Sequence, residues 1–318
     1  MSIVVSDIIT QYGSYYIDGG QSTQDLYKKL YQPSVTASFF QARPTKNTQY
    51  RVGSGDLDRV LQPFQKQFTP IGTFTAKANP IDLFNLKIDK QEYPDEIVDS
   101  WLGFLEGDGI DRSQWPFVRW LLEEHVIPKA QEDYELNEAY AGVFAAPTAG
   151  TAGAAGTAMN GIKKQIANYV TGGLITPITM GAIPATDEDF CTYVETFVAS
   201  IPDLYRAKID YIFMSPALEL KYRKGKRAKY NANWGQDTDL WRLADFPNIK
   251  VQALPSMSGS NKLWATFASN RIRPLRKAQN MNNSLIVNHS PRLVDIYTDW
   301  WEVLGFLYPP AVFVSDQA

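Results

Sequence analysis

The stretch that most constrains the fold covers residues 111–143, the longest part of the chain with helical character and no glycine before Gly142. Asp111 or Ser113 can cap its start, and Gly142 stands where a glycine commonly ends a helix. At about 100° per residue, one broad stripe contains the following side chains: Phe117, Val118, Leu121, Leu122, His125, Leu136, Ala139 and Tyr140. Lys129, Glu132 and Glu135 interrupt this stripe. We therefore predict one long helix that packs this stripe against a core.

A second line of side chains lies on the other side of this helix. Trp120, Ile127 and Tyr134 follow one another at intervals of seven residues and would be half exposed in a monomer. Such a line needs a covering layer or a neighbouring subunit, so these three residues are candidates for an interface. Pro128 cannot bond the Glu124 carbonyl, and we expect a kink or a break there; two ordinary helices meeting at Pro128 are the alternative.

Composition excludes several classes of protein. With 318 residues, 44% of them hydrophobic, the chain can bury a large core in two domains or one elaborate domain. The formal charge of -3 gives no global attraction to nucleic acid or to an anionic membrane. Cys191 is the single cysteine, which excludes an internal disulfide framework and a cysteine-based zinc cage. The sequence has no signal-peptide pattern and no run of about 18 apolar residues, so we expect no membrane span.

The first 93 residues read as an extended region. Residues 1–50 carry few apolar side chains among Gly, Ser, Gln and Thr, which is typical of an arm that lies across other surfaces. Apolar and polar residues alternate at 73–77 and again at 86–89, and we interpret both as strands of one long polar hairpin. Because an isolated hairpin is marginal in water, it should rest on something larger.

The second half reads as mixed helix and strand. Residues 145–160 form a Gly- and Ala-rich tract without the spacing of a phosphate-binding turn, so we predict a flexible loop. Thr186 should cap a helix that begins with three acidic residues. Residues 209–214, IDYIFM, have the composition of a strand covered on both faces. Ser215 and Pro216 then provide a cap and a first-turn proline for the next helix.

Motifs for catalysis are absent. His125 and His289 are the only histidines, and neither has a metal ligand at the required spacing. Walker, nucleophile-elbow and zincin patterns do not occur, so we expect no catalytic, cofactor-binding or metal-binding residues. A pair of carboxylates for glycoside chemistry stays open, because none is marked as a partner of another.

A cluster of cations stands out around Gly225. It consists of Lys221, Arg223, Lys224, Lys226, Arg227 and Lys229. Six cations in nine residues are strongly hydrated, so we predict an exposed cluster that acts in subunit contacts or against DNA rather than in folding. A solvated face paired with acidic neighbours is the alternative.

The order of these parts resembles the major capsid protein of tailed bacteriophages, whose fold is shared with encapsulin nanocompartments and the herpesvirus capsid floor. Three strings add to the likeness: YIFMSPALELKYRKGKRAKY, IKVQALPSM followed by NKLWATFASNRIRPL, and RLVDIYTDWWEVLGFLYPPAVFV. The resemblance implies an α+β phage major-capsid-protein fold. Its parts would be an N-terminal arm at 1–50, an E-loop at 51–97, a P-domain with a spine helix at 98–182, an A-domain at 183–284, and C-terminal strands at 285–318.

The same resemblance implies a structural protein without catalysis or cofactor. Hexamers and pentamers would form an icosahedral head that encloses double-stranded DNA, in a virion assembled in the bacterial cytoplasm. The implied partners are other copies of the chain, portal, scaffold and head-decoration proteins, and DNA through non-specific contact, but no membrane. Because the sequence begins almost at the arm, we expect a separate scaffold protein or none. An encapsulin-like shell and a carbohydrate-active or carbohydrate-binding protein are the alternatives.

Overall fold

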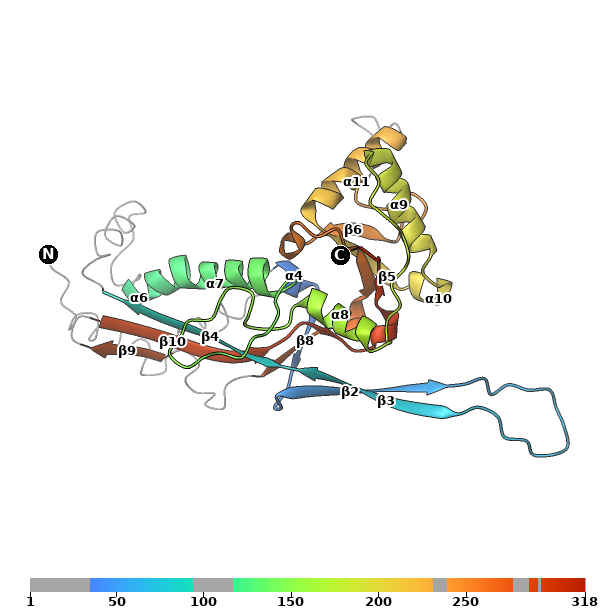
Figure 1. Cartoon of the computed structure of the whole chain (residues 1–318), viewed down its shortest axis with the longest axis horizontal. Coiled ribbons are helices and arrows are strands. Elements are labelled where there is room, and N and C mark those ends of the chain that lie inside the picture. The colour runs from blue at the N-terminus through green and yellow to red at the C-terminus, as the bar shows by residue number, and fades with distance from the viewer. Residues whose placement is uncertain (1–34, 94–116, 231–238, 277–285, 291–292, 318) are drawn as a thin grey trace.

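The computed structural model describes residues 35–93, 117–230, 239–276, 286–290 and 293–317. Three parts are visible in Figure 1: a long sheet with a helix lying along it, a body in which two helices cover a smaller sheet, and a hairpin that projects from their junction. The described residues combine helices with strands that form separate sheets, which is consistent with the predicted α+β class.

The long sheet has six strands. Its central path is β1 (Gln41–Pro44), β8 (Arg271–Arg276), β10 (Leu293–Glu302) and β4 (Phe84–Glu92), with β11 (Gly305–Phe306) paired to β8 and β9 (Ile286–Ser290) paired to β10. β4 and β10 run antiparallel from Val294 opposite Glu92 to Glu302 opposite Phe84. This sheet therefore joins segments separated by about two hundred residues of sequence.

The projecting hairpin is a separate two-stranded sheet of β2 (Gln49–Leu57) and β3 (Phe74–Asp82). The predicted pairing of the segments at 73–77 and 86–89 is therefore wrong. The first segment pairs with β2, and the second belongs to β4 in the long sheet. Only Leu83 separates β3 from β4, and a one-residue interruption cannot reverse the chain into a hairpin.

The long helix runs without interruption through α6 (Phe117–Trp120), a π-helical segment (Leu121–Val126), α7 (Ile127–Asp133) and a second π-helical segment (Tyr134–Glu138). It ends five residues before the predicted end, and residues 111–116 lie outside the described part. The helix does not break at Pro128, so the alternative of two separate helices that meet there is wrong. The first π turn, closed by the Ile127 N–H on the Leu122 carbonyl, ends beside Pro128, which then takes an early position in α7 where a missing N–H is tolerated.

The two π turns change which side of the helix is buried. Each accommodates an extra residue relative to an α turn and so rotates the side chains that follow. The predicted stripe is confirmed at Leu121, Leu122, Ala139 and Tyr140 and wrong at His125 and Leu136, which are exposed, whereas the side chains of Phe117 and Val118 lie outside the description. In place of Leu136, the carboxylates of Glu135 and Glu138 face inward.

The loop after the helix is held by Glu138. Its carboxylate accepts hydrogen bonds from the N–H groups of Gly156 at 2.8 Å, Ala158 at 3.0 Å and Met159 at 3.3 Å. The tract at 145–160 is a loop, as predicted, and α8 (Ile162–Thr171) follows it. The buried carboxylate thus ties the far end of the loop to the end of the long helix.

The compact body is built on a four-stranded sheet in the order β12 (Phe313–Val314), β7 (Trp264–Phe267), β5 (Ile209–Met214) and β6 (Lys250–Ala253). The body also contains the helices α9 (Asp187–Ala199), α10 (Asp203–Arg206) and α11 (Pro216–Lys229), and Figure 1 shows α9 and α11 side by side. Thr186 caps α9 as predicted, because its Oγ1 accepts the Asp189 N–H at 3.2 Å. Ser215 takes the predicted cap position of α11, but its side chain makes no capping hydrogen bond.

The root of the predicted arm is part of the core. Helix α4 (Val35–Ser38) places Thr36 and Ala37 in buried positions, and Phe40 packs against Trp264 and Phe306. Residues 35–50 therefore belong to the folded body in part, whereas residues 1–34 of the predicted arm lie outside the described residues.

Candidate functional site

The tip of the hairpin exposes apolar side chains. Phe64 is 93% exposed, Phe68 90% and Leu61 83%, and the flanking Phe74, Leu57 and Val60 are also more than half exposed. Single exposed apolar residues are ordinary, but a group on one projecting element marks an interaction surface. We call these six residues the hairpin tip. Sequence reasoning missed them, although phenylalanines inside the polar string FQKQF are a usable signal.

The base of the hairpin is fixed. Ile81 is 1% exposed and packs with Leu83, Ile272 and Val303 in a small core of its own. The Asn79 side chain donates to the Phe306 carbonyl at 3.1 Å. The hairpin is thus anchored at one end and open at the other, a geometry suited to reaching a second molecule.

A buried ion pair between two strands of the long sheet also bonds a tyrosine of the long helix. Arg273 donates through two nitrogens to Glu302, which is 1% exposed. Glu302 also accepts the Tyr134 hydroxyl at 2.6 Å and the Trp300 indole N–H at 3.0 Å. Burial, with the nearby Glu302 charge, raises the pKa of Tyr134 well above its ordinary value. The carboxylate therefore has a donor from the helix and donors from two strands.

A second buried carboxylate joins three distant segments. Glu135 accepts the Thr36 N–H at 3.0 Å, the Thr36 hydroxyl at 2.5 Å and the Ser256 N–H at 3.3 Å. Thr36 belongs to α4, and Ser256 to a 3-10 turn (Pro255–Met257) after β6. Glu135 thus fixes the long helix to the compact body and to the first described helix.

The candidate interface on the long helix is mostly internal. Trp120 and Ile127 are each 5% exposed, so the expectation that they would be half exposed in a monomer is wrong. Tyr134 is partly buried, and its hydroxyl donates to Glu302. The Trp120 ring meets the His125 ring edge-on at 4.6 Å. Both side chains are covered within one copy of the chain, so no neighbouring subunit is needed to cover Trp120 or Ile127.

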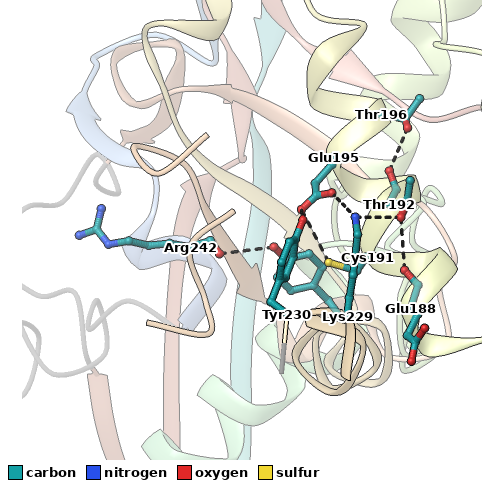
Figure 2. Close-up of polar contacts among 9 residues, drawn as sticks. Glu188, Cys191, Thr192, Glu195, Thr196, Lys229, Tyr230 and Arg242 are labelled. Atoms are coloured by element: carbon teal, nitrogen blue, oxygen red, sulfur yellow. Dashed lines mark hydrogen bonds and ion pairs between the residues drawn. The ribbon is translucent and has the colours of Figure 1, made fainter. Parts of the chain in front are cut away.

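The cation cluster lies on α11, and most of it is used inside the molecule. Lys229 donates to Glu195 at 2.9 Å and to the Thr192 hydroxyl at 3.0 Å, and Tyr230 donates to the same Glu195 at 3.0 Å (Figure 2). Burial alone would lower the pKa of Lys229, but the hydrogen bond and charge of Glu195 outweigh it and raise that pKa. These contacts fix the end of α11 to α9.

Lys226 contradicts the prediction that the whole cluster is hydrated. It is 6% exposed, and its ammonium donates to the carbonyls of Asp239, at 2.9 Å, and Arg242. Burial lowers the pKa of Lys226. A buried ammonium is tolerated when its donors are satisfied, and here backbone carbonyls satisfy them. Lys226 therefore acts in folding, by holding the segment that leads into β6.

The other cations divide into two groups. Lys221 donates to the carbonyls of Pro184 and Ala185, and Arg223 pairs with Glu219 and lies over the Trp241 ring at 5.2 Å. Lys224 and Arg227 are exposed. Solvent therefore reaches these two side chains.

Metal ligands and an activated thiol are missing from the described residues. No group of three or more His, Cys, Asp or Glu residues in this part of the chain could hold a metal ion. Burial, together with the nearby Glu195, raises the pKa of the Cys191 thiol to about 11, so the nucleophilic thiolate is scarce at neutral pH. Among the helices described, none is long and apolar enough to cross a membrane.

Comparison with solved structures defines the class of fold. A chain of the satellite phage P4 procapsid, which includes the size determination (Sid) protein, is similar with a TM-score of 0.62 at 11% identity, over 93% of this chain and 90% of that one. The cyanophage A-1(L) capsid gives 0.55 at 14% identity over 88% and 91%, and the capsid of Myoviridae phage XM1 gives 0.54 at 11% over 87% and 89%. No family model and no curated protein matches the sequence.

These similarities show that the chain has the fold of phage capsid proteins. The predicted fold is therefore confirmed, and it extends over nearly the whole chain. At this level of sequence identity the comparison defines the fold, and function has to be argued from the surfaces described above.

Proposed function

We propose that this chain is the structural major capsid protein of a tailed bacteriophage. Copies assemble into hexamers and pentamers, which form an icosahedral head around packaged double-stranded DNA. The observation that carries the proposal is the hairpin, fixed at its base and apolar at its exposed tip, on a chain with a capsid-protein fold. Burying the tip on a neighbouring copy removes apolar area from water once for every copy in the shell.

The parts of the fold take roles within this proposal. The arm at 1–50, the E-loop at 51–97 and the C-terminal strands at 285–318 connect neighbouring copies or complete the sheets. The P-domain at 98–182 carries the spine helix, and the A-domain at 183–284 carries α9, α11 and the cation cluster. The internal ties at Glu135 and Glu302 support this division, because they hold the parts of one copy together while the tip stays exposed.

Further partners follow from the same role. A head needs a portal for DNA entry, and assembly of such heads uses scaffold and decoration proteins. Packaged DNA would contact the shell without sequence specificity, through local cations, because the chain as a whole has a net charge of -3. The protein acts in the virion after assembly in the bacterial cytoplasm, without a cofactor or catalysis of its own.

Sedimentation velocity of the purified full chain tests the proposal. Particles much larger than a monomer, resolved as closed shells by negative-stain electron microscopy, are the expected result. The combined change Phe64→Ser and Phe68→Ser should abolish or strongly weaken assembly, whereas the matched control, Gln65→Ser with Gln67→Ser, should assemble like the parent. A parent chain that remains monomeric at high concentration would contradict the proposal. Shells that enclose a dedicated protein cargo in their native host, and no genome, would favour the encapsulin alternative.

A further inference from the structure

Two segments that are distant in sequence bring lysines together at the start of α8. Lys163 and Lys164 belong to the first turn of α8, and Lys262 lies on the segment that leads into β7. We call these three residues the lysine patch. The fold assembles it, so no long run of cations marks it in the sequence.

Tyr140 holds the two segments of the lysine patch side by side. Its carbonyl accepts the Lys163 N–H at 3.0 Å, and its hydroxyl shares a hydrogen bond with the Ser260 hydroxyl at 3.0 Å. The Ser260 hydroxyl oxygen also accepts the Lys262 N–H at 3.2 Å. Tyr140 is only 2% exposed, so both lysines are attached to one buried residue.

The ammonium groups of the lysine patch have no counter-charge in contact with them. Lys163 is exposed, and Lys164 and Lys262 are partly exposed. Within the described part of the chain, none of the three forms a salt bridge. The Lys262 ammonium has one hydrogen bond, to the Ser315 carbonyl at 3.5 Å, which is long for such a bond. Burial, together with the nearby Lys163 charge, lowers the pKa of Lys262.

This arrangement of charges is unfavourable unless an anion is present. The nearby carboxylate of Asp316 is already used by the N–H groups of Met180, at 3.1 Å, and Gly181, at 3.3 Å. The first turn of a helix lies at the positive end of its macrodipole, where acidic residues are favoured, but α8 has none there. Like charges that lie close together also repel one another. A bound anion relieves both effects.

We propose that the lysine patch faces the interior of the shell and binds phosphate groups of the packaged double-stranded DNA. This inference rests on the proposed capsid function and assigns its DNA contact to named residues. Lysine binds a phosphate as a point charge and does not read the bases, which suits a shell that packages DNA without sequence specificity. Each copy of the chain adds one such weak contact, and the contacts sum over the shell.

The cations of α11 are less available for the same role. Lys221 and Lys226 donate to backbone carbonyls, and Lys229 donates to Glu195. The lysine patch differs because its ammonium groups are not taken up by carboxylates of the described residues.

Lysine acetylation, read by mass spectrometry, tests the contact in assembled particles. Shells assembled from the purified chain without DNA and shells filled with DNA receive the same reagent. Lys163 and Lys262 should lose most of their acetylation in the filled shells, because a neighbouring phosphate holds an ammonium in its protonated, unreactive form. Lys46 and Lys208, which are exposed and lie outside the patch, report any general change in access of the reagent.

The salt dependence of DNA binding by the unassembled full chain gives an independent readout. The double variant Lys163→Gln with Lys262→Gln should reduce the slope of log Kobs against log salt concentration by about 1.8, since each neutralised phosphate contributes about 0.9. The matched control, Lys46→Gln with Lys208→Gln, removes two exposed lysines elsewhere and should keep the slope of the parent. Urea unfolding of each variant shows that the fold is retained.

The outcomes separate this inference from the function it rests on. Equal acetylation of Lys163 and Lys262 in filled and empty shells, or an unchanged salt slope in the double variant, would overturn the DNA contact and leave the shell proposal intact. Protection that is already complete in empty shells would assign the patch to a contact between proteins and overturn the DNA contact as well. A parent chain that never assembles would instead overturn the proposed function, and the DNA contact with it.

Discussion

Replacing Gly225 with alanine tests how closely α9 and α11 pack. Gly225 lies inside α11, where alanine is favoured over glycine by about 1 kcal/mol, so propensity alone predicts a more stable protein. The added Cβ, however, would stand 1.8 Å from the Asp187 carbonyl oxygen and 2.4 Å from its carbon. Both atoms are backbone atoms, so no side chain can rotate away and the helices must separate.

The magnitude follows from these two opposing effects. Forcing one extra carbon into a packed contact costs about 1–3 kcal/mol and occasionally more, and the backbone contact places this site at the upper end. After subtraction of the gain in propensity, we expect Gly225→Ala to destabilise the chain by about 2 kcal/mol. Helix propensity, which is all that the sequence shows, predicts that Gly225→Ala stabilises the chain instead.

Urea unfolding of the unassembled chain, followed by tryptophan fluorescence, measures this change. Ala228→Gly is the matched control, because Ala228 is exposed on the same helix and reports propensity alone, with an expected loss of about 1 kcal/mol or less. A Gly225→Ala protein that unfolds at the same or a higher urea concentration than the parent would refute the close packing of α9 and α11.

Three further changes test the internal contacts. Lys226→Gln should lower the free energy of unfolding by about 1–3 kcal/mol, because the shorter, uncharged side chain cannot replace the ammonium that bonds the carbonyls of Asp239 and Arg242. Lys224→Gln should change it by less than about 0.5 kcal/mol, and equal effects in urea unfolding would contradict the placement of Lys226. Glu302→Ala should lower the free energy of unfolding by about 3–5 kcal/mol, because Arg273 is then buried without its Glu302 counter-charge. A variant that unfolds at nearly the same temperature as the parent would show that the Arg273–Glu302 pair does not stabilise the fold. Burial raises the pKa of Tyr134, so the stability that this group contributes is complete below its unfolded-state pKa of about 10 and is lost as pH rises towards its folded-state pKa. The free energy of unfolding of Tyr134→Phe should therefore fall less steeply than that of the parent above about pH 10. Identical pH profiles for the two proteins would show that Tyr134 is not buried in this way.

Local signals in the sequence identified the elements of the compact body. The cap at Thr186 and the β-branched string at 209–214 gave a helix and a central strand at the expected places. Such elements are specified by neighbouring residues, through capping and burial periodicity, so a single sequence contains what is needed to predict them.

The sequence does not predict which distant strands pair with one another. Alternation at 86–89 correctly indicates a strand, but it does not say that the partner is β10 rather than the preceding strand. A period of two defines the two faces of a strand and leaves its neighbours undefined. The sequence therefore predicts the polar, extended hairpin but pairs it with the wrong second strand.

The buried charges were missed for a related reason. Glu135 lies on the stripe predicted to face the core, where a carboxylate alone reads as an interruption, but Thr36 and Ser256 donate to it there. Lys226 belongs to a run of cations that composition places in water, yet two backbone carbonyls pair its ammonium. Partners from remote segments decide both cases, and a window of sequence does not contain them.

A cryo-electron microscopy reconstruction of the assembled particles tests the central claim most directly. The account predicts a closed shell of hexamers and pentamers in which the hairpin of each copy lies on a neighbouring copy, with Phe64 and Phe68 removed from water. A shell in which both phenylalanines remain in solvent, or a chain that forms no closed particle at any concentration, would contradict it.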